Sequence, residues 1–291
     1  MSTVILLLIT GLGLGALYFL VASGLSLIYG LMGVLNFAHG SFLTLGAFAG
    51  WELARRTGAD NWLSFVASVL LGAVVGAVFA ALTELLLIRR LYERHIEQVL
   101  VTVGLALSSV ALFDGIWGTD PVYVSGPSWM GGTTDVFGAS IPNNRFVLIL
   151  AAVLVLLGIV LFLKYTRFGL IIRAGVENRS MVTALGIDVR RAFTVVFAIG
   201  GAAAGIGGVL AASYYGYVSS SIGGSLLIFA FIVTVIGGLG SLSGAAIAAA
   251  LVAVLQQFAN FYLGGTGDFV VVLLLAVVLL VRPSGLLGSK A

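Results

Sequence analysis

Long apolar stretches, each about as long as a membrane is thick, constrain the fold of this chain more than any other feature. A helix needs about 20 apolar residues to cross a hydrocarbon core of about 30 Å. Of the 291 residues, 60% are hydrophobic and only 9% are charged, whereas a soluble domain carries roughly 25% charged residues. Such a chain cannot cover a globule with polar surface, so lipid must surround most of it. The sequence therefore predicts an all-α, polytopic transmembrane helix bundle.

The apolar stretches divide the chain into about eight or nine membrane segments. Read to within a few residues, the candidate stretches are 4–29, 36–53, 62–88, 99–117, 146–163, 192–217, 226–262 and 269–281. All four prolines fall outside them, as expected because proline breaks a helix interior. No stretch is polar enough for a separate soluble domain, so we expect 1–291 to form a single transmembrane domain.

The stretch 226–262 is too long for one simple crossing and is interrupted by small residues. These are Gly237, Gly238, Gly240, Ser241, Ser243 and Gly244. We predict two helical pieces separated by a break. Lipid cannot satisfy irregular backbone, so the break must lie against protein or a water-filled path.

The distribution of basic residues predicts the orientation of the chain. If the N-terminus is outside and 226–262 crosses twice, the segments 89–94, 164–191 and 282–290 all face the cytoplasm. They hold three, six and two of the 14 Lys and Arg residues. This is a strong positive-inside asymmetry, and it places the C-terminus in the cytoplasm. The loop 118–144 has no Lys or Arg and is predicted to be an irregular extracytoplasmic cap.

Glycines spaced four apart predict close helix packing. The pairs are Gly11 and Gly15, Gly46 and Gly50, Gly72 and Gly76, Gly201 and Gly205, and Gly240 and Gly244. Small residues at this spacing let helix backbones approach closely in a membrane. The alternative to close packing is that glycine merely makes the helices narrower.

The sequence carries no motif for covalent or hydrolytic chemistry. It has no H-E-x-x-H, no G-x-S-x-G and no P-loop, since neither lysine follows a glycine. Cysteine is absent, and His39 and His95 are too far apart in sequence to make a metal site alone. We expect no catalytic residue, no cofactor, no metal and no nucleic-acid partner.

The ionisable residues within the spans lie near their predicted ends. We interpret them as interfacial charges that are paired or solvated, with Glu84 near Arg89, Glu97 near Arg94, and Glu52 near two arginines. Proton-driven pumps usually place carboxylates or histidines deep in the membrane, so this pattern disfavours one. Sodium coupling through backbone carbonyls stays open.

The longest loop on the predicted cytoplasmic side, about 165–191, contains the signature of a short helix. Asn178 suits an N-cap and Gly186 suits the C′ position. Between them lies a small apolar face, made by Met181, Val182 and Leu185. A helix of about two turns is not stable without a partner. It lies either at the lipid headgroups or against another protein.

Short blocks spread over nearly the whole chain carry a resemblance to a known family. They are GLSLIYG (24–30), GVLNFAHG (33–40), RA (173–174), ENR (177–179), ALGI (184–187), GGLGS (237–241) and RPSGL (282–286). In sequence and order they resemble the permease subunits of ABC importers for branched-chain amino acids. The Asn-Phe-Ala-His-Gly block is the most specific and is similar to one paralogue of these permeases.

The resemblance implies an ABC-type permease that works by alternating access in the bacterial cytoplasmic (inner) membrane. Its expected partners are a second permease subunit, usually a paralogue, two cytoplasmic ATPases, an extracytoplasmic substrate-binding protein and membrane lipid. Leucine, isoleucine and valine are the default substrates. Urea, short amides and other amino acids are the alternatives. A secondary carrier or channel that works without an ATPase is a further alternative.

The resemblance also implies two sets of site residues. The loop would be the coupling segment that docks on an ATPase, through Arg173, Glu177, Asn178, Arg179, Met181, Val182, Leu185 and Gly186. Residues 175–176 and 180–183 depart from the family pattern, which puts in doubt which ATPase docks. The candidates for the translocation path are Asn36, His39, Ser41, Ser241, Ser243 and Gln256. Each of these has an alternative interpretation, as a polar group that satisfies a helix start or faces a neighbouring helix.

Overall fold

The computed structural model describes residues 2–33, 35–58, 61–92, 94–177, 179–184, 186 and 188–288. The α-helices are α1 (Ser2–Met32), α2 (His39–Thr57), α3 (Trp62–Leu86), α4 (His95–Trp117), α5 (Asn144–Tyr165), α6 (Arg167–Glu177), α7 (Arg179–Ala184), α8 (Val189–Tyr215), α9 (Ile222–Gly237), α10 (Leu242–Tyr262) and α11 (Gly267–Val281). Shorter elements are the 3₁₀ turns η1 (Ile88–Leu91) and η2 (Ser128–Gly131) and the strands β1 (Val122–Tyr123), β2 (Thr133–Val136), β3 (Ala139–Pro142) and β4 (Tyr217–Val218).

The predicted polytopic helical bundle is confirmed. The helices α1, α3, α4, α5, α8 and α10 are long and apolar enough to cross a membrane, and α9 and α11 are shorter apolar helices. The helix α2 matches a further predicted segment, although it carries Glu52, Arg55 and Arg56 near its C-terminal end. The break predicted within 226–262 is also observed, because α9 ends at Gly237 and α10 begins at Leu242.

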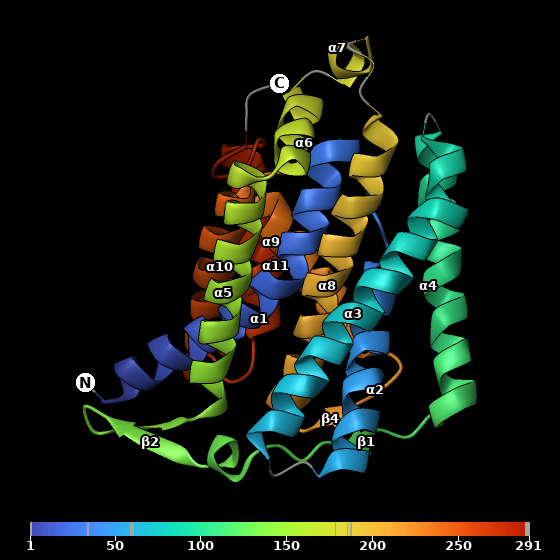
Figure 1. Ribbon diagram of the computed structural model, residues 1–291. Helices are drawn as coiled ribbons and strands as arrows, with labels where there is room; N and C mark the ends of the chain where they lie inside the picture. The colour runs from blue at the N-terminus through green and yellow to red at the C-terminus, as the bar shows by residue number, and fades with distance from the viewer. Residues whose placement is uncertain are drawn as a thin grey trace.

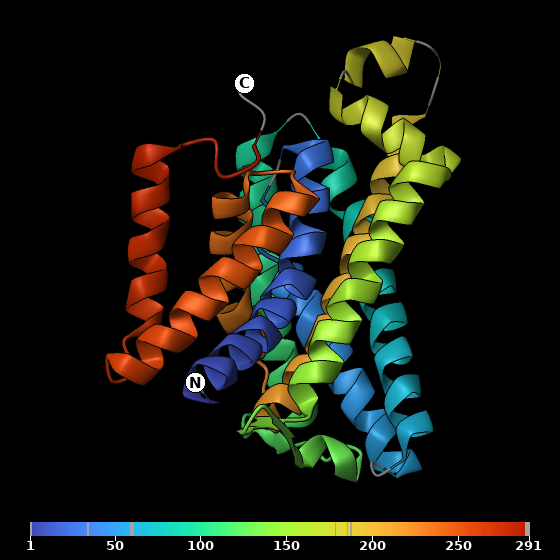
Figure 2. The same ribbon diagram turned by 90° about the vertical axis from the view of Figure 1, so that its left-hand side faces the viewer.

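The most buried helices, α1 and α8, occupy the middle of the bundle. α8 packs against α2 and α3, while α1 packs against α5, α9 and α10. α4 lies at one edge of the bundle (Figure 1), and α11 lies at another (Figure 2).

Close glycine contacts join the central helices, as the spacing predicts. A Cβ atom on Gly205 of α8 would lie 2.0 Å from the carbonyl oxygen of Gly72 on α3, and one on Gly76 would lie 2.3 Å from that of Gly201. A Cβ on Gly46 of α2 would lie 2.6 Å from the Cα of Gly205. These helices touch backbone to backbone, which only glycine permits at such distances.

The two ends of the bundle differ. α6, α7 and the C-terminal end lie at one end, and the N-terminal end lies with β2 at the other (Figure 1). At the first end, the segment after α11 folds back onto α9, because the Leu286 and Leu287 amides donate to the carbonyls of Ile236 and Gly237 at 2.8 and 3.0 Å. These bonds satisfy carbonyls that a helix C-terminus otherwise leaves unpaired.

The prediction that 118–144 is irregular is wrong in part. β2 and β3 form an antiparallel hairpin, closed by Phe137 and Gly138, which both have positive φ, the backbone form of a tight two-residue turn. β1 pairs with β4, which follows α8 in the chain. A strand of two residues with so distant a partner carries no local sequence signal.

Candidate functional site

The connection between α1 and α2 descends into the bundle. His39 Nε2 lies 3.1 Å from the carbonyl oxygen of Val21. Val21 precedes the last residue of α1 by eleven positions, which is about 16 Å at 1.5 Å per residue. The chain therefore turns back along α1, and α2 begins deep inside the bundle.

Asn36 organises the start of α2. Its Oδ1 accepts a hydrogen bond from the Ala38 amide at 3.0 Å, and its backbone carbonyl accepts one from the His39 amide at 3.2 Å. The Asn36 side chain is buried, and its Nδ2 has no hydrogen-bond partner within the described residues. Asn36 thus satisfies a helix start, which was one of its two interpretations, and its role in translocation stays a prediction.

His39 is fully buried between helices. Its ring lies edge-on to Phe42, with centroids 5.7 Å apart, and its Nδ1 has no hydrogen-bond partner in the described part of the chain. Glycine at position 24 makes room for it, because a Cβ there would lie 2.8 Å from His39 Cε1 and 2.5 Å from the Gly200 carbonyl oxygen. Ser41, in the first turn of α2, is also buried.

The start of α9 meets the start of α2. The Gly223 amide donates to Thr44 Oγ1 at 3.1 Å, and a Cβ on Gly40 would lie 2.6 Å from the Gly223 carbonyl oxygen. Thr44 therefore satisfies one of the amides that the N-terminus of α9 leaves unpaired. Sequence analysis did not identify Thr44, because its role depends on a residue 179 positions away.

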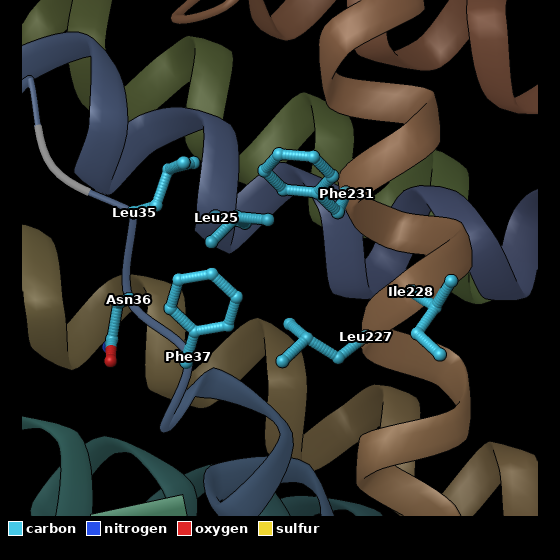
Figure 3. A pocket seen from close by; sticks show the side chains of 7 residues that line it. All are labelled: Leu25, Leu35, Asn36, Phe37, Leu227, Ile228 and Phe231. Carbon is cyan, nitrogen blue, oxygen red and sulfur yellow. The ribbon is translucent and has the colours of Figure 1, made fainter. Parts of the chain in front are cut away.

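A cavity of about 150 Å³ opens beside this junction. Its lining comes from α1, the connection and α9, namely Leu25, Leu35, Asn36, Phe37, Leu227, Ile228 and Phe231. Figure 3 shows Leu227 and Phe37 pointing toward each other across it, while the amide group of Asn36 points away. The cavity is therefore apolar, and the polar end of Asn36 points away from it and binds the Ala38 amide at the start of α2. Apolar lining residues carry no distinguishing signal in so apolar a sequence.

Ser241 and Ser243 lie at a different level. Ser241 caps α10, because its Oγ accepts a hydrogen bond from the Gly244 amide at 3.1 Å, and it lies 3.5 Å from Ser243 Oγ. The adjacent Gly240 packs on Gly30 near the end of α1, nine positions or about 14 Å along that helix from Val21. The structure does not bring these serines together with His39.

Gln256 is buried and belongs to a polar network that reaches the exposed Asp268. Its Oε1 accepts a hydrogen bond from Tyr18 Oη at 2.8 Å, and its Nε2 donates to Asp268 Oδ1 at 2.7 Å. The Tyr18 ring stacks on Phe229, with centroids 5.0 Å apart. The network ties α1, α10 and α11 together, so Gln256 faces neighbouring helices, and its place on a translocation path stays a prediction.

Glu84 is not an interfacial charge, so that interpretation was wrong for this residue. Its side chain is 0% exposed, at the end of α3, and it forms no ion pair with a described residue. Its Oε2 accepts a hydrogen bond from Thr194 Oγ1 on α8 at 2.6 Å, and its Oε1 accepts one from Tyr92. The interfacial interpretation is confirmed for Glu52 and Glu97, which pair with neighbouring arginines at 2.6–3.2 Å.

The segment predicted to couple to an ATPase projects beyond the bundle as α6 and α7 (Figures 1 and 2). Within it, Arg173 is exposed, and Gly186 has a φ of +76°, as its predicted C′ position requires. Of the predicted apolar face, Met181 is 62% exposed and Val182 is buried, and its role in docking stays a prediction. Asn178 and Leu185, and the side chains of Glu177 and Arg179, lie outside the described residues.

Comparisons with known proteins point to one family. Residues 7–282 match the family model described as a branched-chain amino acid transport system permease component. The chain is 30% identical to the high-affinity branched-chain amino acid permease LivH of Salmonella typhimurium, covering 96% of this chain and 93% of LivH. It is 31% identical to BraD of Pseudomonas aeruginosa, covering 97% and 94%. The fructose import permease FruF of Bifidobacterium longum is 27% identical, covering 86% and 69%. No solved structure matches the chain.

Proposed function

This chain belongs to the family of branched-chain amino acid transport system permease components, and from that premise we propose that it is the transmembrane permease subunit of an ATP-driven importer. It moves substrate inward by alternating access and catalyses no reaction itself. The observation that carries this proposal is the projection of α6 and α7 from the end of an otherwise membrane-embedded bundle. A helix as short as α7 needs packing against another surface to persist, and a docked ATPase would supply such a surface.

An ATPase docked on α7 would act on the centre of the bundle. Only a few residues separate α7 from α8, the helix that packs against α2, α3 and α1. Movement of α7 thus reaches the junction at His39 through one continuous helix. Arg173, Glu177, Asn178, Arg179, Met181, Val182, Leu185 and Gly186 are the proposed coupling residues.

The orientation proposed for the chain follows from its basic residues. The end that carries α6 and α7 also holds Arg89, Arg190 and Arg282 near the ends of α3, α8 and α11. Positive residues concentrate on the cytoplasmic side of membrane proteins. The N-terminus and the β2–β3 hairpin would then face outward, where a substrate-binding protein delivers its ligand.

Branched-chain amino acids are the proposed substrates, by analogy with the relatives LivH and BraD. Urea, short amides and other amino acids are the second candidates. The proposed assembly contains a second, paralogous permease and two ATPases. The path candidates retained are Asn36, His39 and Ser41 at the junction, with Ser241, Ser243 and Gln256 at other levels of the bundle.

Reconstitution in proteoliposomes tests the proposal. Vesicles that contain both permeases and the ATPases, with the binding protein outside, should accumulate radiolabelled leucine only when ATP is supplied inside. Replacing 179–184 with a Gly-Ser linker of equal length should lower uptake at least roughly tenfold while the permeases still assemble. Uptake by the chain alone, or full uptake with the linker variant, would contradict the proposal and favour a secondary carrier.

A further inference from the structure

The connection between α1 and α2 exposes irregular backbone at membrane depth. It lies between the end of α1 and the level of Val21, where His39 binds. Gly33 and Phe37 are exposed, the latter by 37%. Irregular backbone at this depth is tolerated only where it is buried in protein or lines a water-filled cavity.

Three consecutive amides on this connection have no partner among the residues that the structure describes. The backbone N–H groups of Leu35, Asn36 and Phe37 have no hydrogen bond to any described residue. An unpaired amide in hydrocarbon costs several kcal/mol, so this face cannot border lipid. Unpaired amides beside a helix N-terminus are the groups with which membrane transporters bind the carboxylate of a substrate.

The apolar cavity lies on the same connection. The cavity is partly open, and its volume of about 150 Å³ equals that of an enclosed engineered cavity in another protein that binds benzene. A branched aliphatic side chain of three or four carbons is smaller than benzene. The cavity therefore has room for it, and its lining offers such a group a wholly apolar surrounding (Figure 3).

We propose that this cavity and the adjoining backbone form an amino-acid site within the permease, with the aliphatic side chain in the cavity and the carboxylate on the backbone amides of 35–37. The inference rests on the proposed function and deepens it by naming where the permease recognises the substrate during transport. It also explains why Asn36 turns its amide away from the cavity, since an apolar lining selects for aliphatic side chains.

Leu227 is the residue with which to test this site, because its side chain points into the cavity (Figure 3). Leu227→Phe should fill the cavity, and Leu227→Ala should enlarge it. Leu161→Phe is the matched control, since Leu161 is exposed on α5, far along the chain from this junction. Uptake of L-leucine and L-alanine is measured in the reconstituted complex with the same binding protein throughout, so that its own preference cancels in the comparison.

We expect Leu227→Phe to lower the leucine-to-alanine uptake ratio by roughly tenfold, since one methylene in an apolar pocket changes selectivity about 10–200-fold. Leu227→Ala should raise the uptake of L-phenylalanine relative to leucine, and Leu161→Phe should leave both ratios unchanged. The Leu227→Ala measurement carries the test if the bulkier variant fails to assemble.

Unchanged ratios in both Leu227 variants would overturn the inference, and the cavity would then hold a side chain of the second permease. A uniform loss of uptake for every substrate in a fully assembled Leu227→Ala complex would overturn it as well. Failure of the unaltered complex to import any amino acid with ATP is a different result, because it contradicts the proposed function itself.

Discussion

At the scale of single residues, Glu84 shows how a carboxyl group is accommodated inside the bundle. Its carboxylate accepts hydrogen bonds from Thr194 and Tyr92, and the Tyr92 ring lies edge-on to Phe193 with centroids 4.9 Å apart. Thr194 and Phe193 lie in the first two turns of α8, shortly after α7. Glu84 therefore ties the end of α3 to the part of α8 that follows the proposed coupling segment.

Removing one donor from this carboxylate should destabilise the protein. Thr194→Val leaves a buried carboxylate oxygen without its partner, and we expect the free energy of unfolding to fall by about 1–3 kcal/mol. The midpoint of thermal unfolding in detergent measures the change.

Thr102→Val is the matched control for this prediction. Thr102 is buried, whereas Thr194 is half-buried, and among the described residues the Thr102 hydroxyl donates to a carbonyl of its own helix, that of Val99. Its loss should have a smaller effect, and Thr194→Ser should retain stability. Equal shifts for the two valine variants would contradict the role assigned to Glu84.

At the scale of elements, the bundle is held at its centre by backbone contacts between α3 and α8. Carbonyl oxygens of one helix occupy the space where a Cβ of the other would lie. Within a membrane, the hydrophobic effect does not favour helix association, because lipid tails are as apolar as the side chains. Close van der Waals packing provides the attraction instead. A side chain at these positions must push the helices apart.

Gly76→Ala should therefore destabilise the bundle, because its Cβ would lie 2.3 Å from the Gly201 carbonyl oxygen. Overpacking of this kind costs about 1–3 kcal/mol, visible as a lower unfolding midpoint. Gly158→Ala on α5 provides the control, since no described atom of another helix lies within 4 Å of its added Cβ. Alanine favours a helix over glycine by up to about 1 kcal/mol, so this variant should be neutral or more stable. A similar loss in both variants would show that helix packing is not responsible.

At the scale of the whole molecule, the ends of the helices sort by charge. The end with α6 and α7 gathers most of the basic residues, while the hairpin end has none between Gly118 and Asn144. The orientation proposed from this asymmetry sets the direction of transport, because it decides which end meets the ATPases and which end meets the binding protein.

Cysteine labelling measures the orientation directly, since the natural chain has no cysteine. Thr133→Cys on the hairpin and Ala184→Cys on α7 both replace exposed residues. A membrane-impermeant maleimide should label Thr133→Cys in intact cells and Ala184→Cys only after permeabilisation. The reverse pattern would place α7 outside and exclude an ATPase partner there.

The sequence alone determined which segments are helical and where 226–262 breaks. Backbone within lipid must be hydrogen-bonded internally, so a long apolar stretch has little choice but to form a helix. It also indicated the glycine contacts, because spacing along a helix places small residues on one face. For the site, it identified Asn36 and His39, since polar groups stand out in so apolar a chain.

Only the tertiary structure decided how deep α2 begins, which amide Thr44 satisfies, that Glu84 is buried, and that Leu227 and Leu25 enclose a cavity with Phe37. Each of these depends on pairs of residues far apart in the sequence. Lipid imposes the same apolar composition on every surface that it touches, so composition cannot distinguish a side chain that lines a cavity from one that faces the membrane.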